Sequence, residues 1–85
     1  MNGDTMNLYR ETKWLRFMVT EKKPITVVLN VRNKVSDQLL GEIKWNGPWR
    51  QYVYYNLGID AQFNDGCLKD IADVLSSLNK EHKEK

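Results

Sequence analysis

The chain has 85 residues, of which 41% are hydrophobic, with a formal net charge of +2 and one cysteine. This length allows one small domain, and the lone Cys67 excludes an intramolecular disulfide and fits a reducing compartment. No run approaches the roughly 18 apolar residues of a membrane span, and residues 1–12 lack the basic start and apolar run of a signal peptide. We therefore expect a cytoplasmic protein without a membrane segment.

The first part of the chain predicts a domain boundary and two strands. Residues 1–12 are polar and aperiodic, which predicts a flexible or edge segment in front of one domain over residues 13–80. Residues 14–20 and 25–32 each alternate between apolar and polar side chains, and the second stretch is rich in β-branched residues. Both are expected strands, separated near Pro24 because proline cannot donate a hydrogen bond to a sheet.

Two further expected strands flank a turn. Residues 38–45 and 50–57 alternate on either side of Asn46-Gly47, a dipeptide that favours hairpins because both residues tolerate positive φ. Gly41 indicates a bulge or a close approach of a covering helix. The alternation places these side chains on the core side: Leu39, Ile43, Trp45, Val53, Tyr55 and Leu57.

The last part of the chain predicts one amphipathic helix. Apolar residues recur at helical spacing from Cys67 to Leu78, and Asn64 can cap the helix start. Residues 81–85 are expected to form a frayed charged tail, with His82 in solvent. The predicted fold is therefore α+β, a four-stranded antiparallel meander in the order β-β-β-β-α with the helix packed on one face. The other face of the sheet is left uncovered.

This uncovered face carries the functional hypothesis. Aromatic rings can stack on bases while cations hold phosphates, and single-stranded nucleic acid offers both groups. Residues 13–56 also carry eight cations against three anions, which favours an anionic partner. The candidate ligand-binding residues expected on this face are Trp14, Arg16, Arg32, Lys44, Arg50, Tyr52 and Tyr54. We therefore expect a non-enzymatic protein that binds single-stranded nucleic acid or a nucleotide on its sheet.

A second hypothesis explains the same residues. Tyrosine, tryptophan and arginine are also enriched at protein interfaces, so the face is equally typical of a protein-interaction module. Self-association as a homodimer or a higher homo-oligomer is expected as well, because a small core leaves one sheet face to be buried. Catalysis, a cofactor and a metal are not expected. Cys67 has no partner histidine nearby in the sequence, and no phosphate-binding glycine loop or zinc-ligand spacing is present.

Two resemblances extend these hypotheses. The order of four strands followed by a helix is similar to the module of Whirly proteins and of single-stranded-DNA-binding transcriptional coactivators, which implies binding on sheet surfaces of dimers or larger assemblies. The segments Leu40-Gly41-Glu42-Ile43-Lys44-Trp45, Trp49-Arg50-Gln51-Tyr52 and Cys67-Leu68 with Ile71 resemble a small family of uncharacterised phage and mobile-element proteins.

The phage resemblance rests on the pattern LGxIKW…WRxY…CLxxI and covers about residues 25–79. The chain departs from that pattern at Tyr54-Tyr55-Asn56, where Phe-Phe-Pro is expected. The resemblance implies a phage context. In that context, a protein-interaction module could serve as an inhibitor of a host protein that acts in defence.

Overall fold

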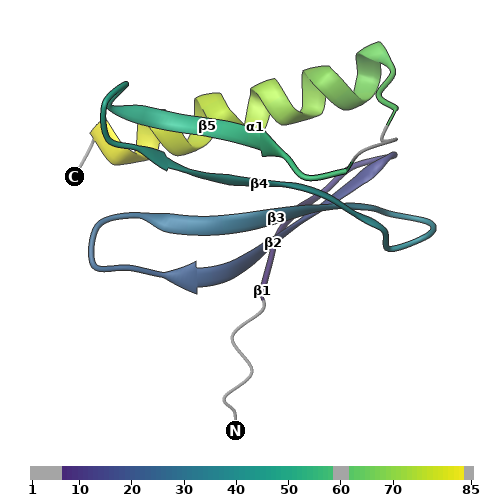
Figure 1. Ribbon diagram of the computed structural model, residues 1–85, viewed down its shortest axis with the longest axis horizontal. Helices are drawn as coiled ribbons and strands as arrows, with labels where there is room; N and C mark the ends of the chain where they lie inside the picture. The colour runs from purple at the N-terminus through teal and green to yellow at the C-terminus, as the bar shows by residue number, and fades with distance from the viewer. Residues whose placement is uncertain (1–6, 59–61, 84–85) are drawn as a thin grey trace, which may run out of the picture.

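Five antiparallel strands and one helix form the part of the chain that the computed structural model describes, residues 7–58 and 62–83. Each strand pairs with the next one in the sequence, so the sheet order is β1-β2-β3-β4-β5 (Figure 1). The elements are β1 (Asn7–Glu11), β2 (Leu15–Lys22), β3 (Val27–Asn33), β4 (Leu39–Asn46), β5 (Gln51–Asn56) and α1 (Asp65–Lys83). The α+β class and the antiparallel meander are confirmed, but the sheet has five strands where four were predicted.

The additional strand is β1, an edge strand that the alternation did not reveal. Its pairing with β2 shifts by one residue between Leu8 and Arg10, which marks a bulge at Tyr9. The bulge turns two successive side chains toward the helix. The Tyr9 hydroxyl donates to Glu81 Oε2 at 3.3 Å, and Arg10 Nη2 donates to Ser77 Oγ at 3.1 Å. A bulge interrupts the two-residue period, so this strand lacks the sequence pattern of the others.

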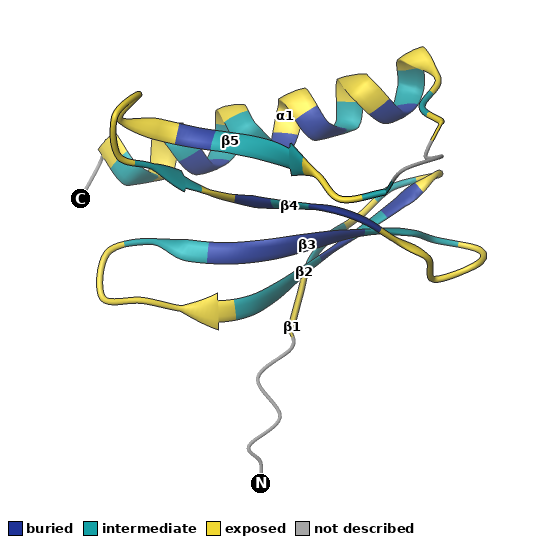
Figure 2. Cartoon of the chain, in the orientation of Figure 1, coloured by how far each residue is buried: buried dark blue, intermediate teal, exposed yellow. Residues whose placement is uncertain are grey.

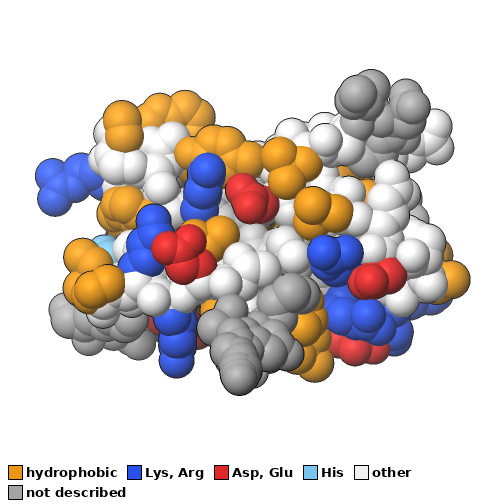
Figure 3. All heavy atoms as spheres, turned by 60° about the horizontal axis from the view of Figure 1, so that its bottom comes forward, with side chains coloured by type: hydrophobic (Ala, Val, Ile, Leu, Met, Phe, Trp, Pro, Cys, Tyr) orange, Lys and Arg blue, Asp and Glu red, His pale blue; other side chains and the backbone are white. Residues whose placement is uncertain are grey.

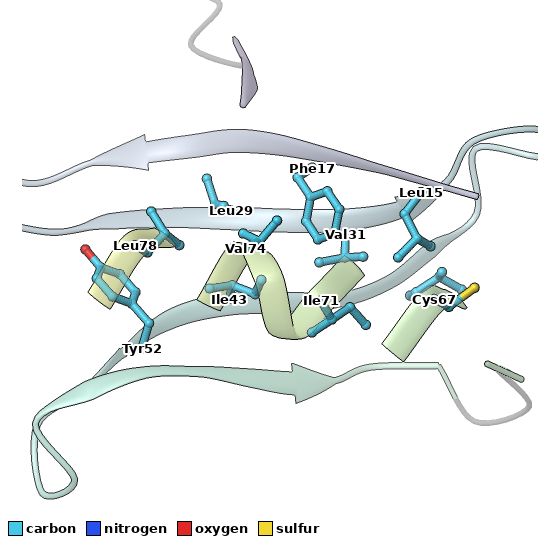
Figure 4. Close-up of a cluster of buried hydrophobic side chains, with 11 residues drawn as sticks. Leu15, Phe17, Leu29, Val31, Ile43, Tyr52, Cys67, Ile71, Val74 and Leu78 are labelled. Carbon is cyan, nitrogen blue, oxygen red and sulfur yellow. The ribbon is translucent and has the colours of Figure 1, made fainter. Parts of the chain in front are cut away.

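The core lies between the sheet and α1, and Figure 4 shows side chains of both layers pointing toward one another. Its members are Leu15, Phe17, Leu29, Val31, Leu40, Ile43, Tyr52, Cys67, Ile71, Val74 and Leu78. Figure 2 shows the same burial along β3 and on the sheet-facing side of the helix. Each fully buried aliphatic or aromatic side chain contributes about 1.5–3 kcal/mol, so these residues dominate the stability of a domain this small. Cys67 belongs to the core, as predicted.

The helix begins and ends at residues with clear physical roles. Asn64 Oδ1 accepts a hydrogen bond from the Cys67 backbone N–H at 2.8 Å, which makes Asn64 the N-cap. The helix continues to Lys83, so the expectation of a frayed tail is wrong for residues 81–83, and residues 84–85 lie outside the described residues. Residues 1–6 of the expected N-terminal segment also lie outside them. Within the described part of the chain, no helix is long and apolar enough to cross a membrane.

A four-residue turn, residues 47–50, joins β4 to β5. The backbone N–H of Arg50 donates to the Asn46 carbonyl at 2.8 Å, and the Trp49 N–H donates to Asn46 Oδ1 at 2.8 Å. Arg50 has a φ of 56°, which closes the turn in the left-handed region. The turn therefore lies one residue later than the four residues, 46–49, that the two expected strands left between them.

The position of this turn sets which residues of β4 and β5 pair, and the pairing decides which face of the sheet each β5 side chain occupies. Trp45 pairs with Tyr52 and Ile43 pairs with Tyr54. Paired residues of antiparallel strands point to the same side, so both tyrosines face the helix together with Ile43 and Trp45. The prediction that Tyr52 and Tyr54 lie on the uncovered face is wrong. The core-side prediction is also wrong for Val53 and Tyr55, which lie on the opposite face of the sheet, and for Leu57, which is exposed after the end of β5.

A second shift corrects the β4 register. Val31 pairs with Gly41 but Arg32 pairs with Leu39, which leaves Leu40 as an extra residue in β4. Leu40 is buried and Leu39 is exposed, so the inward prediction for Leu39 is wrong. Gly41 does mark a close approach, but of β5 rather than of the helix.

Candidate functional site

The sheet face that points away from α1, hereafter the uncovered face, is built from all five strands. One row of paired residues crosses the whole sheet and consists of Leu8, Met18, Asn30, Glu42 and Tyr55. Neighbouring rows add Glu11, Arg16, Arg32, Leu39, Lys44, Val53 and Val28. The face is thus mixed, with apolar, acidic and basic side chains next to one another.

Of the seven predicted ligand-binding residues, Arg16, Arg32 and Lys44 lie on the uncovered face. Their guanidinium and ammonium groups are not free to hold phosphate, because carboxylates face them. Arg16 lies 3.7 Å from Glu11 and 3.7 Å from Asp37, and Arg32 Nη1 lies 3.7 Å from the same aspartate. The described ion pairs therefore neutralise much of this face.

Lys44 and Lys34 are paired in the same way. Lys44 Nζ lies 3.9 Å from Glu42 Oε1 and 4.8 Å from the centre of the Tyr55 ring. Lys34 Nζ lies 3.1 Å from Glu11 Oε2, and this hydrogen bond holds the pKa of the Glu11 carboxyl below its usual value. Figure 3 shows the result, with acidic and basic side chains interspersed rather than gathered into areas of one sign. The excess of cations over residues 13–56 gave a wrong expectation for this face, because Glu11 of β1 lies outside that range and pairs with cations within it.

Tyr52 and Tyr54 point toward the helix, so neither side chain can contact a ligand on the uncovered face. Tyr52 is 5% exposed, and its hydroxyl oxygen accepts a hydrogen bond from the Val27 N–H at 3.2 Å. Tyr54 packs against the core with its ring edge-on to Phe63, at 6.1 Å between ring centres. Burial raises the pKa of both phenol groups above the ordinary value of 10.0. These rings stabilise the fold and cannot stack on a base.

Trp14 lies at the opposite end of the molecule from the β4–β5 turn. It precedes β2 in a turn, is 42% exposed, and has Lys13 Nζ 5.1 Å from its ring centre. Its indole Nε1 approaches the helix start so closely that a Cβ atom at Gly66 would lie 2.9 Å from it. Trp14 therefore borders a cleft of about 500 Å³ beside Cys67 rather than the uncovered face.

Arg50 lies in a second cleft, hereafter the basic cleft, of about 500 Å³. This cleft lies between the β4–β5 turn and the last turns of α1. Its walls include Trp45, Arg50, Asn79, Lys80, His82 and Lys83. No carboxylate of the described residues lines it, and Arg50, Lys80 and Lys83 form no ion pair with any of these residues.

Aromatic rings form one side of the basic cleft. The His82 ring lies 4.2 Å from the Trp45 ring at an interplanar angle of 33°, and Tyr52 meets both rings edge-on. His82 Nδ1 is buried without a hydrogen-bond partner. The prediction of a solvated His82 is therefore wrong. A signal was present in the sequence, because His82 follows Leu78 by four residues and so extends the buried stripe of the helix.

The chain's histidine and cysteine lie at opposite ends of α1. Cys67 is in the first turn and His82 in the last, which separates them by about 22 Å at 1.5 Å per residue. Among residues 7–58 and 62–83, no three histidine, cysteine, aspartate or glutamate side chains come together in a way that could hold a metal ion.

No protein-family model matches the chain, and no solved structure matches it. The resemblance to Whirly modules rested on four strands before the helix, and the chain has five. The sequence is 31% identical over 78 residues to an uncharacterised 9.3 kDa protein of Acholeplasma phage L2. That alignment covers 88% of this chain and 96% of the phage protein, in agreement with the expected phage context. The chain therefore belongs to the family of this uncharacterised phage protein.

Proposed function

We propose that this phage-family protein is a small non-enzymatic binding protein whose ligand carries phosphate and a base, and that the basic cleft holds this ligand. The ligand class is the predicted one, a nucleotide or single-stranded nucleic acid, but the site differs from the predicted one. The observation that carries the proposal is the set of three cations around one cleft, Arg50, Lys80 and Lys83, which form no ion pair within residues 7–58 and 62–83 and lie beside an aromatic wall.

The cations suit a phosphate in complementary ways. Arg50 presents a planar fork that can bond two phosphate oxygens at once, whereas Lys80 and Lys83 act as mobile point charges. The two lysines are three residues apart on α1 and are therefore neighbours on the helix surface. A helix end with negative partial charge opposes an anion, but its roughly −0.5 elementary charge is small against three full positive charges.

The aromatic wall suits a base. Trp45 and His82 are half-buried and their rings stack on one another, tilted by 33° with 4.2 Å between ring centres, so a base could extend this stack next to the cations. A base stacked on an aromatic side chain contributes about 1–3 kcal/mol, and this contribution is tolerant of base identity. A volume of about 500 Å³ lies within the usual range for small-ligand sites.

Residues of the pattern that resembles the phage family also lie at this cleft. Trp45 and Arg50, from LGxIKW and WRxY, line the cleft, and Tyr52 packs edge-on against Trp45 at 5.4 Å between ring centres. The uncovered face supports phosphate binding less well, since its cations are matched by carboxylates and its predicted stacking tyrosines lie in the core.

The test is a titration of the full chain with a fluorescent oligothymidylate and, in a second arm, with ATP, each at several salt concentrations. A Lys80→Ala/Lys83→Ala variant should bind the oligonucleotide more weakly. It should also lower the slope of log K against log salt by about 1.4, because each phosphate contact of a single strand contributes about 0.7. The two arms distinguish a nucleic-acid strand from a free nucleotide.

The matched control removes two charges at the other end of the helix. Lys13 and Lys69 are exposed and do not line the basic cleft, so Lys13→Ala/Lys69→Ala should leave both titrations unchanged. Equal weakening by both double variants would show only a general charge effect and would overturn the site. No binding of either probe to the folded wild type at low salt would overturn the function and favour the protein-interaction alternative.

A further inference from the structure

The centre of the uncovered face contains a buried polar atom that nothing satisfies. Asn30 lies in the middle strand β3, is 7% exposed, and its Oδ1 has no hydrogen-bond partner. A buried acceptor left in this state costs about 1–3 kcal/mol. It lies on the sheet face that α1 does not cover but is itself buried, so a donor from outside the chain reaches it once the Asn30 side chain turns toward the surface.

The surroundings of Asn30 are suited to being buried further. Met18 and Glu42 flank it along its row, and Leu8 at the edge of this row is 54% exposed. Leu39 is exposed in the next row. Apolar and charged side chains are thus mixed across the face, as in the more polar interfaces between proteins that also exist as monomers.

The area is large enough for a stable contact between two proteins. Five strands about 4.8 Å apart, each about seven residues long at about 3.3 Å per residue, give a face of roughly 550 Å². Two such faces bury about 1,100 Å² together, which exceeds the roughly 1,000 Å² expected of a specific interface. The face thus has the dimensions of a small but specific docking surface.

The chemistry of the face favours an identical partner. Its ion pairs leave both signs of charge close together, so a second copy meets no area of uniform like charge. A carboxamide is self-complementary, because its N–H₂ group donates to the same oxygen type that it carries. A two-fold axis passing near Asn30 would bring the two amides together and supply the donor that Oδ1 lacks.

We propose that the uncovered face is an interface between two copies of this chain, packed face to face about a two-fold axis near Asn30. This inference does not depend on the basic cleft, which lies at the end of α1 and stays open in such a dimer. The direct measurement is the mass of the full chain in solution by light scattering and sedimentation, from micromolar to millimolar concentration. Twice the monomer mass is expected, and a chain that stays monomeric at millimolar concentration overturns the proposal.

Two matched variants locate the interface. Leu8 and Leu68 have almost the same exposure, 54% and 55%, but Leu8 lies on the uncovered face and Leu68 on the solvent side of α1. Leu8→Glu should weaken dimerisation at least tenfold while Leu68→Glu leaves it unchanged. Equal effects of the two substitutions contradict the assignment of the face.

A covalent trap tests the position of the axis. Asn30→Cys should be joined to its own copy by a short bismaleimide, because residues next to a two-fold axis face their own copies and sheets packed face to face lie about 10 Å apart, too far for a direct disulfide. Leu68→Cys serves as the control for random collision and should stay monomeric. Circular dichroism of each variant verifies folding, and failure of folded Asn30→Cys to crosslink any faster than folded Leu68→Cys overturns the proposed axis.

Discussion

Substitution of Gly41 by alanine tests the β4–β5 register on which the placement of the tyrosines depends. A Cβ atom built at Gly41 would lie 2.5 Å from Tyr54 Cζ, from Tyr54 Oη and from the Tyr55 backbone oxygen. Ordinary contacts between such atoms are about 3.5–4.0 Å, so the overlap is about 1 Å or more. The Tyr54 ring can swing aside, but the Tyr55 carbonyl belongs to the sheet and moves only if the strands separate.

The expected sign follows from two opposed effects. Alanine loses less conformational entropy than glycine on folding, which favours Gly41→Ala by about 0.5–1 kcal/mol. Overpacking costs about 1–3 kcal/mol, and a clash with backbone belongs at the upper end of that range. We therefore expect a net loss of about 2 kcal/mol. For a domain of this size each kcal/mol shifts Tm by about 4–8 °C, so Tm should fall by about 8–16 °C in a calorimetric or circular-dichroism melt.

The matched control is Gly47→Ala in the β4–β5 turn. A Cβ atom there meets nothing within 4 Å, and Gly47 does not have a positive φ. Its free energy of unfolding should stay within about 0.5 kcal/mol of the wild-type value, as for surface substitutions in general. If Gly41→Ala raised Tm or left it unchanged, the Tyr54 ring could not lie over Gly41, and the inward placement of the β5 tyrosines would be refuted.

Two further predictions concern the core and the helix start. Burial raises the folded-state pKa of Tyr52 above 10.0, so the unfolded chain ionises first and stability should fall as the pH rises above about 10. Urea unfolding from pH 8 to 11 measures this, and Tyr52→Phe should flatten the decline; an equally steep decline in the variant contradicts the assignment. Asn64→Ala removes the cap on the Cys67 N–H and should cost about 0.5–2 kcal/mol, whereas Asn64→Asp should retain most of the stability. Equal losses in these two urea-unfolding measurements would show that the cap is not the cause.

Elements whose period continues over most of their length were predictable from the sequence, whereas irregularities gave a wrong element or a wrong inward face. β3 and β2 up to Val19 alternate, α1 keeps a helical spacing, and the register shift of β2 falls only at Thr20, near the end of the strand. β1 was missed because the bulge at Tyr9 breaks the period. One extra residue at Leu40 likewise displaced Leu39 from the core to the surface.

The candidate site was less predictable because it depends on the turn between two strands. Residues 51–55 place aromatic rings on both faces of β5, so composition alone does not say which set is buried. The four-residue turn decides it through the pairing of Trp45 with Tyr52. Arg50 lies in the basic cleft and not on the uncovered face where it was expected, and its neighbours there, Lys80 and Lys83, come from the far end of the chain.

The bulge in β1 also governs how this protein can assemble. An exposed sheet edge offers unpaired backbone groups to which another strand can add, and such growth has no natural end. β1 is short, irregular and ends in Arg10 and Glu11, so it is a poor template for another strand. Growth into fibres along the edge is therefore disfavoured, whereas association through a face stops at a closed pair.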